Sequence, residues 1–455
     1  MHRSPLAFVL ATAVAASALT IPARAQQFTE EQATARPLGD IEFDWGRDGI
    51  NCPTCNFGQG NSRLNWTDRQ GNLWVAHLDP TTGLLNTPLA NDELADTNAF
   101  FWNVYGNGPE WAFSTQNGEV ISQLVYTRHK PNEPAKTGFA GAAFATMVNG
   151  VWTAQFLPGA IGKGVASQGT NNSNLPEGSQ CNSDPVATAI WKNFATPQQV
   201  FTEPVSSAAG TAPTLTPFGA FANGIGERFV PCTHQLLFQG LAPPGPQGHV
   251  FQQVYWYDWD TQVVQQLTAD ATTKYGGFMF QAPDFNDSYI FFTIANRLTL
   301  NVYQQTGVNA NGSPAFTKVN SIASTDPAEP YINSAEPFIN CTPTCETYVY
   351  MTVAKTPTAQ QGVTTPIGLA VAALNPATPM FTILAPASYT DPVQRLDPEY
   401  FVTANGPYLY YNRVQVESGS TTYKNEGLWF IDMQLGTPSG PCVGSSAEGG
   451  LLPGC

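Results

Sequence analysis

The sequence predicts an all-β fold, a single closed β-propeller with seven blades. Strand-like runs are short and are separated by frequent turn signals, in a chain with 40 Gly and 37 Pro. No stretch carries apolar residues at the i, i+3, i+4, i+7 spacing of a helix over three turns. A motif of proline, acid and aromatic residue, followed by an aromatic-rich strand, occurs at 108–111, 282–285, 336–338 and 397–400. A supersecondary unit repeated at this period is typical of a propeller blade.

The spacing of the repeats predicts the number of blades. The motif prolines are Pro109, Pro283, Pro337 and Pro398. The last two intervals are 54 and 61 residues, and the first is 174, which accommodates two further units near Pro185 and Pro231. An N-terminal unit at 64–79 brings the total to seven; six is the alternative if the unit at Pro185 is an insertion. We expect the terminal strands to share one blade, because closure protects the strand edges.

The chain divides into four parts. Residues 1–25 have a basic start, an apolar run from Leu6 to Leu19 and a small-residue cleavage site, which predicts a signal peptide and a secreted or periplasmic protein. We expect an N-terminal arm over 26–60, the propeller over 61–440 and a disulfide-stapled tail over 441–455. The stretch 158–183, rich in Gly, Asn and Ser, is interpreted as a long surface loop.

Two local features supplement this division. Asn149-Gly150 between two apolar runs is the strongest short-range signal for a hairpin. Eight cysteines in an exported chain predict disulfides. Their order along the chain favours the local pairs Cys52–Cys55, Cys181–Cys232, Cys341–Cys345 and Cys442–Cys455.

The charge of the chain excludes several kinds of partner. The formal net charge is −15, and no run of basic residues occurs. Such a chain is not expected to bind nucleic acid, whose phosphates require clustered Lys and Arg. No apolar run beyond the signal peptide is long enough to cross a bilayer, so we expect no membrane insertion. We expect a monomer.

The stretch from Val254 to Thr268 resembles a known family. Its Tyr-Trp-Tyr-Asp-Trp-Asp-Thr, followed by Gln-Gln-Leu-Thr, is similar to the repeat of TolB-type, PD40-like propellers. The proline-acid-aromatic openings resemble a degenerate form of the family's Pro-x-Ser-Pro-Asp-Gly turn. The family includes periplasmic scaffold proteins, peptidase propeller domains and a lyase of pectic oligosaccharides, so the resemblance implies the architecture and not the activity.

Acidic residues at the innermost strands are the first candidates for a functional site. Because the innermost strands of a propeller line its channel, these acids are expected to converge at one mouth. They are Glu110, Asp284, Glu336, Asp397 and Glu399. Such carboxylates can act as acid and base on a sugar, or bind Ca²⁺ together with carbonyl oxygens. The alternative is that they accept hydrogen bonds from turn N–H groups, which the recurrence of the acid favours.

The segment 40–49 breaks the repeat and is the second candidate. It concentrates acids around one tryptophan, and we expect it to border the channel mouth together with the 158–183 loop. The predicted catalytic residues are Asp44, Asp48, Asp284 and Glu336. The predicted substrate-binding residues are Trp45, Glu110, Trp111, Asp397 and Glu399.

Three functional hypotheses follow. The first is a glycan-active enzyme, hydrolase or lyase, acting on a polysaccharide or another extracellular polymer. The second is a non-catalytic propeller that binds a polymer or a partner protein. The third is a metal-dependent lyase in which His129 and His234 meet an acid at the channel; no HxH or HExxH spacing supports it. No cofactor is predicted, although a structural Ca²⁺ is compatible with the acids.

Overall fold

The computed structural model describes twenty stretches of the chain. They are residues 28–36, 39–44, 63–68, 70–79, 82–85, 91–100, 108–116, 119–129, 139–171, 186–193, 199–206, 213–215, 225–231, 233–242, 250–342, 344–357, 366–388, 392–403, 405–416 and 423–437. The predicted signal peptide and the 441–455 tail lie outside them.

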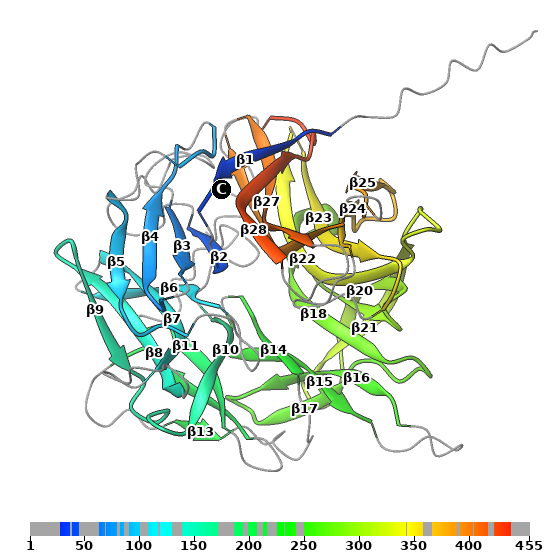
Figure 1. The fold of residues 1–455 in the computed structure, drawn as a ribbon. Helices are drawn as coiled ribbons and strands as arrows, with labels where there is room; N and C mark the ends of the chain where they lie inside the picture. The colour runs from blue at the N-terminus through cyan, green and yellow to red at the C-terminus, as the bar shows by residue number, and fades with distance from the viewer. Residues whose placement is uncertain are drawn as a thin grey trace, which may run out of the picture.

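The described residues form seven four-stranded antiparallel sheets arranged around a common axis (Figure 1). Blade 1 contains β2 (Gly39–Asp44), β3 (Arg63–Thr67), β4 (Leu73–His77) and β5 (Glu93–Asp96). Blade 2 contains β6 (Glu110–Gln116), β7 (Glu119–His129), β8 (Phe139–Val148) and β9 (Val151–Phe156). Blade 3 contains β10 (Gly164–Thr170), β11 (Thr188–Asn193), β12 (Val200–Pro204) and β13 (Thr214–Leu215). In each of these blades the first strand is the innermost and the last is the outermost.

The remaining four blades follow the same order. Blade 4 contains β14 (Ile225–Val230), β15 (Gln235–Leu241), β16 (Gln252–Asp258) and β17 (Val263–Gln266). Blade 5 contains β18 (Lys274–Ala282), β19 (Ser288–Ala295), β20 (Thr299–Val308) and β21 (Pro314–Ala323). Blade 6 contains β22 (Tyr331–Cys341), β23 (Cys345–Ala354), β24 (Gly368–Ala373) and β25 (Phe381–Ala385), and blade 7 contains β26 (Val393–Thr403), β27 (Gly406–Val416), β28 (Tyr423–Asp432) and β1 (Glu30–Thr34). The predicted seven-bladed propeller is confirmed.

The ring closes in blade 7, where the N-terminal β1 pairs antiparallel with β28. Glu30 of β1 binds Arg395 of β26, with its carboxylate oxygens 2.7 Å from Nε and 2.9 Å from Nη2. Arg395 Nη1 also donates to the carbonyl oxygen of Ile367 in the neighbouring blade, at 2.8 Å. The segment 26–60, expected to be an arm, therefore supplies two strands of the propeller. They are β1, the outermost strand of blade 7, and β2, the innermost strand of blade 1.

The apolar core lies between neighbouring blades. One cluster joins blades 6, 7 and 1, with Phe338, Tyr410 and Leu64 among its buried members. Side chains alternate between the two faces of each strand, so each blade presents an apolar face to both neighbours. Packing of this kind holds the inner strands at fixed positions around the axis.

Two local predictions had different outcomes. The Asn149-Gly150 hairpin is confirmed: β8 and β9 pair through Val148 and Val151, and both turn residues have positive φ. The 158–183 loop prediction is wrong for its central part, because Gly164–Thr170 is β10, the innermost strand of blade 3. This strand consists of small and polar residues apart from Val165, so its propensity for β structure is weak and pairing with β11 determines its conformation.

One predicted disulfide falls partly on described residues. Cys345 is disulfide-bonded, and in the β22–β23 hairpin its position is directly opposite Cys341. The identity of its partner stays a prediction. The other six cysteines lie outside the described residues.

Candidate functional site at the propeller axis

The innermost strands of blades 4 to 7 share a β-bulge that aims one side chain at the axis. Each bulge begins at a residue with positive φ: Gly226, Gly276, Ser334 and Asp397, at 78°, 56°, 44° and 53°. The regular register resumes two residues later, at Arg228, Phe278, Glu336 and Glu399 respectively. A bulge reorients the strand and re-aims the side chain that follows it. These four residues therefore occupy one structural level in four consecutive blades.

Arg228 reaches from blade 4 to blade 6. Its Nη2 donates to Glu336 Oε1 at 2.8 Å, while its guanidinium lies 3.9 Å from the ring centroid of Phe278 in blade 5. Because blade 5 separates blades 4 and 6, the guanidinium must pass over the axial edge of blade 5. Arg228 is only 8% exposed, so both contacts form in a largely dehydrated setting.

Two glutamates meet at one tyrosine hydroxyl. The hydroxyl oxygen of Tyr350, on β23, lies 3.0 Å from Glu336 Oε2 and 3.0 Å from Glu399 Oε2. A phenol has a single proton and can donate to only one of them. The second contact is a hydrogen bond only if that carboxyl group is itself protonated and donates to the tyrosine oxygen.

Arg228 distinguishes the two glutamates, because its guanidinium, which stays charged, donates to Glu336 Oε1. Glu336 and Glu399 therefore lie side by side on one hydroxyl group, with a cation on Glu336. Two carboxyl groups in such close contact can divide the roles of acid and base.

Asp284 does not belong to this site. It lies in η3 (Pro283–Phe285), beyond the end of β18, and its Oδ2 accepts a hydrogen bond from the backbone N–H of Thr347 at 3.1 Å. The Thr347 hydroxyl donates to the other carboxylate oxygen. Burial raises the pKa of Asp284, and the two Thr347 hydrogen bonds oppose the rise. Asp284 thus fastens blade 5 to blade 6 through the backbone.

The other predicted residues lie in different settings. Asp397 begins the bulge in β26, and its Oδ2 accepts the backbone N–H of Ile41 at 2.9 Å, which joins blade 7 to blade 1. Glu110 is buried in β6 opposite Val125. Trp111 is 1% exposed and lies under the guanidinium of Arg63, at 4.7 Å, so the structure leaves it no face for stacking against a sugar.

Most of the segment 40–49, which breaks the repeat, lies outside the described residues. Asp44 is the last residue of β2, and its side chain lies outside the described part, as do Trp45 and Asp48. The structure therefore brings together Glu336 and Glu399 from the predicted set, and adds Arg228, Phe278 and Tyr350, which were not predicted.

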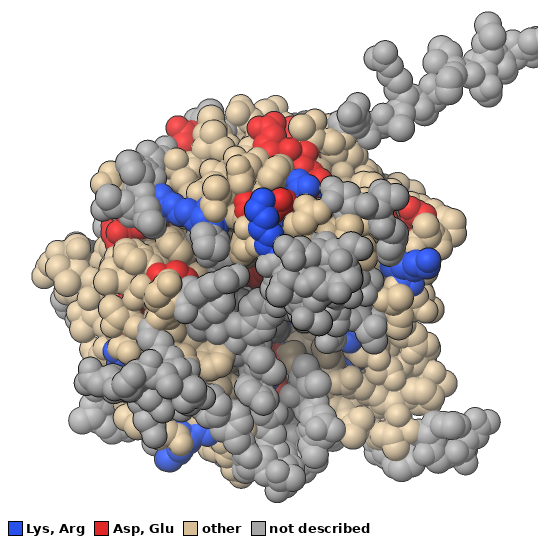
Figure 2. All heavy atoms as spheres, viewed as in Figure 1, with Lys and Arg blue, Asp and Glu red and all other residues tan. Residues whose placement is uncertain are grey.

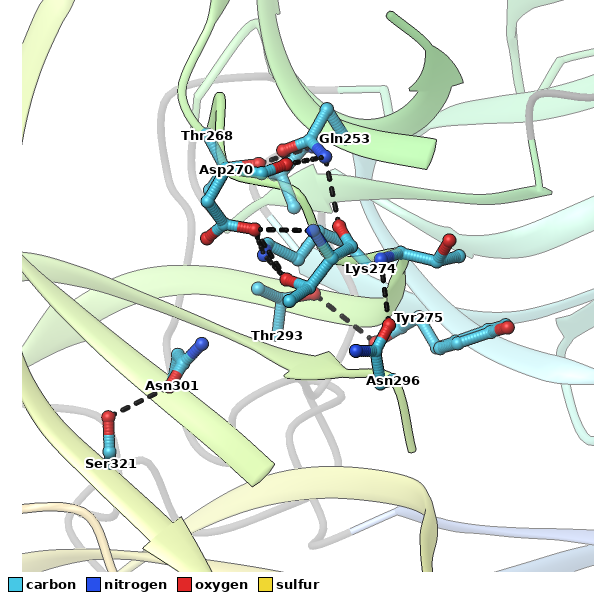
Figure 3. A network of polar contacts seen from close by, with 12 residues as sticks. Gln253, Thr268, Asp270, Lys274, Tyr275, Thr293, Asn296, Asn301 and Ser321 are labelled. Atoms are coloured by element: carbon cyan, nitrogen blue, oxygen red, sulfur yellow. Dashed lines mark hydrogen bonds and ion pairs between the residues drawn. The ribbon is translucent and has the colours of Figure 1, made fainter. Parts of the chain in front are cut away.

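A second polar network lies between blades 4 and 5 (Figure 3). The side chain of Lys274 is fully buried at the start of β18, where its ammonium binds the Asp270 carboxylate and the Thr272 hydroxyl. Gln253 Nε2 donates to the carbonyl oxygens of Asp270 and Thr272, at 3.0 and 2.9 Å. Burial lowers the pKa of Lys274, although the Asp270 carboxylate opposes this. Because the amine is enclosed by its own loop, this network fixes the connection between the blades and offers no access to a ligand.

The described residues contain no group of three or more His, Cys, Asp and Glu side chains placed to hold a metal ion. His129 is buried in blade 2 next to Phe100, and His234 of blade 4 binds Asp260. No helix in the described part of the chain is long and apolar enough to cross a membrane. On the face seen in Figure 2, Lys and Arg are dispersed among acidic and neutral side chains.

Comparison with known proteins supports the architecture alone. No family model and no curated protein sequence matches the chain. Among solved structures, it is similar to a chain described as TolB from Agrobacterium tumefaciens, with 12% identity, 62% of this chain and 82% of that chain covered, and a TM-score of 0.33. It is also similar to prolyl oligopeptidase B from Galerina marginata (10% identity; 83% and 47% covered; TM-score 0.40) and to a protein of unknown function from Dyadobacter fermentans (9%; 88% and 96%; 0.40). The likeness to TolB-type propellers is thus one of fold.

Proposed function

We propose that this protein is an exported glycan-active enzyme whose reaction takes place at the propeller axis, between Glu336 and Glu399. The observation that carries the proposal is the hydroxyl of Tyr350, 3.0 Å from a carboxyl oxygen of each glutamate. Two carboxyl groups in a shared hydrogen-bond chain, one ionised and one protonated, are the catalytic equipment of a glycoside hydrolase.

We assign a role to each glutamate from the contact of Arg228 with Glu336. Glu399 is the general acid, which gives its proton to the oxygen of the glycosidic bond as the bond to the anomeric carbon breaks. Glu336 is the ionised partner, held by Arg228 and Tyr350, and attacks the same carbon to form a glycosyl-enzyme. Water, deprotonated by Glu399, then displaces Glu336 and restores both groups. The close approach of both carboxyls to one hydroxyl favours the retaining geometry, in which the two groups are about 5 Å apart.

A polysaccharide panel tests this proposal. Products are measured as new reducing ends, which report hydrolysis, and by the ultraviolet absorbance of unsaturated sugars, which reports elimination. We expect Glu399→Gln and Glu336→Gln to lower turnover by about 10²- to 10⁴-fold, the usual contribution of a positioned acid or base. Asp284→Asn is the matched control, because this buried acid contacts only the scaffold, and its turnover should equal that of the wild type.

The non-catalytic propeller is the second candidate, and one observation favours it. Asp284 and Asp397 each accept a backbone N–H of a neighbouring blade, as turn-capping scaffold acids do. If the whole panel gives no product while a polysaccharide binds and Glu399→Gln leaves that binding unchanged, the acid pair is part of the scaffold and the enzymatic proposal fails.

A further inference from the structure

Arg228 has hydrogen-bond donors that none of the described residues accepts from. Its only hydrogen bond runs from Nη2 to Glu336, so Nε and Nη1 donate to no protein atom in the part of the chain that the structure describes. The side chain is only 10% exposed, and an arginine as buried as this normally has all of its hydrogen-bond donors satisfied. Neither Nε nor Nη1 of Arg228 is among the buried side-chain atoms that lack a hydrogen-bond partner, so solvent or a ligand can reach both.

The position of the guanidinium points these donors at the proposed reaction centre. One face rests on Phe278, which prevents the group from turning away, and one edge is fixed by Glu336. Since the side chain crosses the axial edge of blade 5, the free edge lies on the axial side, next to the Glu336–Tyr350–Glu399 chain. Nε and Nη1 point to different sides of the planar guanidinium, and each can donate a charge-assisted hydrogen bond to a carboxylate oxygen.

We propose that Arg228 forms an anion subsite, and that the substrate is an acidic glycan whose sugar carboxylate accepts a hydrogen bond from the unused donors of this guanidinium. This inference rests on the proposed glycan activity and adds the class of sugar. Phe278 packs against one face of the guanidinium and Glu336 binds one of its nitrogens. The guanidinium is therefore held in a fixed orientation before the substrate carboxylate binds. A neutral sugar in the same place would leave the donors unpaired and would bind less well.

The test compares two pools of oligosaccharides that differ only in charge. One pool contains uronic-acid oligomers from several acidic polysaccharides, and the other is the same pool with each carboxyl reduced to a primary alcohol. Binding is measured by calorimetry on the Glu399→Gln protein, and turnover on the wild type. We expect the acidic pool to bind at least 10-fold more tightly than the reduced pool. This preference should fall at least 10-fold in Arg228→Lys, because lysine keeps a positive charge beside Glu336 but lacks the planar guanidinium and its donors.

Arg413→Lys is the matched control. Arg413 also stacks on an aromatic ring, Trp429 at 4.3 Å, and also pairs with a glutamate, Glu426 at 3.0 Å, but it lies on β27, the second strand of blade 7, and not on an innermost strand. Its substitution should leave the preference unchanged. Circular dichroism and thermal unfolding establish that each variant is folded.

The outcomes separate this inference from the function on which it rests. If both pools are cleaved at equal kcat/KM, the enzyme is glycan-active and the anion subsite is refuted. If neither pool is cleaved, but the acidic pool binds and the binding depends on Arg228, the subsite stands and the enzymatic proposal fails. If an acidic preference persists unchanged in Arg228→Lys, another residue recognises the carboxylate and the assignment to Arg228 is wrong.

Discussion

Two sets of buried or partly buried acids in this propeller differ in the groups that they contact. Glu203 and Asp284 accept hydrogen bonds from backbone N–H groups of chain segments that belong to other blades or to the links between them. Glu336 and Glu399 instead contact the side chains of Arg228 and Tyr350 next to the axis. A backbone amide cannot be replaced by a ligand without unfolding its segment, whereas side-chain partners can exchange protons and rearrange. On the proposed function, the kind of partner that an acid contacts, and not its burial, distinguishes a scaffold acid from a reactive one.

The largest expected effect on stability is at Glu203. Its Oε1 accepts the N–H of Gly159 at 2.7 Å in the link from blade 2, and its Oε2 accepts the indole N–H of Trp191 at 2.8 Å. Glu203→Ala leaves two buried donors unpaired, each worth about 1–3 kcal/mol, so we expect the free energy of unfolding to fall by about 3 kcal/mol. Urea unfolding measures the loss, and turnover per folded molecule should stay at the wild-type value. A loss of turnover without a loss of stability would place Glu203 among the reactive acids instead.

An intermediate effect, with a defined pH dependence, is expected at the ring closure. Burial alone would raise the pKa of Glu30, but hydrogen bonds from Arg395 and Tyr411 and the charge of Arg395 hold that pKa below its model-peptide value of 4.5. An acid with a lowered folded-state pKa stabilises the fold above its unfolded pKa, and this contribution is lost as pH falls through the folded value. Glu30→Gln should therefore cost about 2 kcal/mol at pH 7, and less at about pH 3.

Urea unfolding of the wild type and Glu30→Gln at both pH values checks the sign of this effect. The matched control is Glu31→Gln, one residue along the same strand and on its opposite face, where no ion pair forms among the described residues. A constant difference between wild type and Glu30→Gln across the pH range would show that the closure depends on shape and not on the charge of Glu30.

The architecture was predictable from the sequence because its signals are local. The Asn149-Gly150 turn, the alternation of apolar residues and the spacing of the proline motifs each depend on a few neighbouring residues. β10 was missed because its small residues carry no strand signal until β11 pairs with them. The closing role of β1 follows from its pairing with β28, a partner about 400 residues away, which no local pattern specifies.

The site was only half predictable because one motif serves two structures. Pro283 starts a 3-10 turn beyond β18, where the first residue needs no N–H partner. Pro337 lies within β22, where it is tolerated because an innermost strand has a free edge. The motif therefore grouped Asp284 with Glu336, although the two acids differ in height along the blades. A finer signal was present: Gly226, Gly276, Ser334 and Asp397 each precede an axial residue by two positions. This signal finds Arg228, but only after the bulges have been aligned by strand pairing.

The smallest expected effect is at Asp284, and it separates the two sets of acids most directly. Because burial raises its pKa, the ionised carboxylate contributes least to stability at neutral pH, and the contribution of Asp284 declines as pH rises through the folded value. Asp284→Asn keeps one acceptor for Thr347, so we expect a loss of at most about 1 kcal/mol in the free energy of unfolding at pH 7. The loss should not shrink toward acid pH, in contrast to that of Glu30→Gln.

Turnover is the second measurement on Asp284→Asn. Asp284→Asn should turn over the polysaccharide panel at the wild-type rate, while Glu399→Gln should be nearly inactive at unchanged stability. Each substitution replaces a carboxyl group by an amide of nearly the same shape, so a difference in their effects must arise from position. If Asp284→Asn abolished turnover, the proline motif would mark reactive acids in both of its structural settings, and the distinction drawn between fastening and reacting acids would not hold.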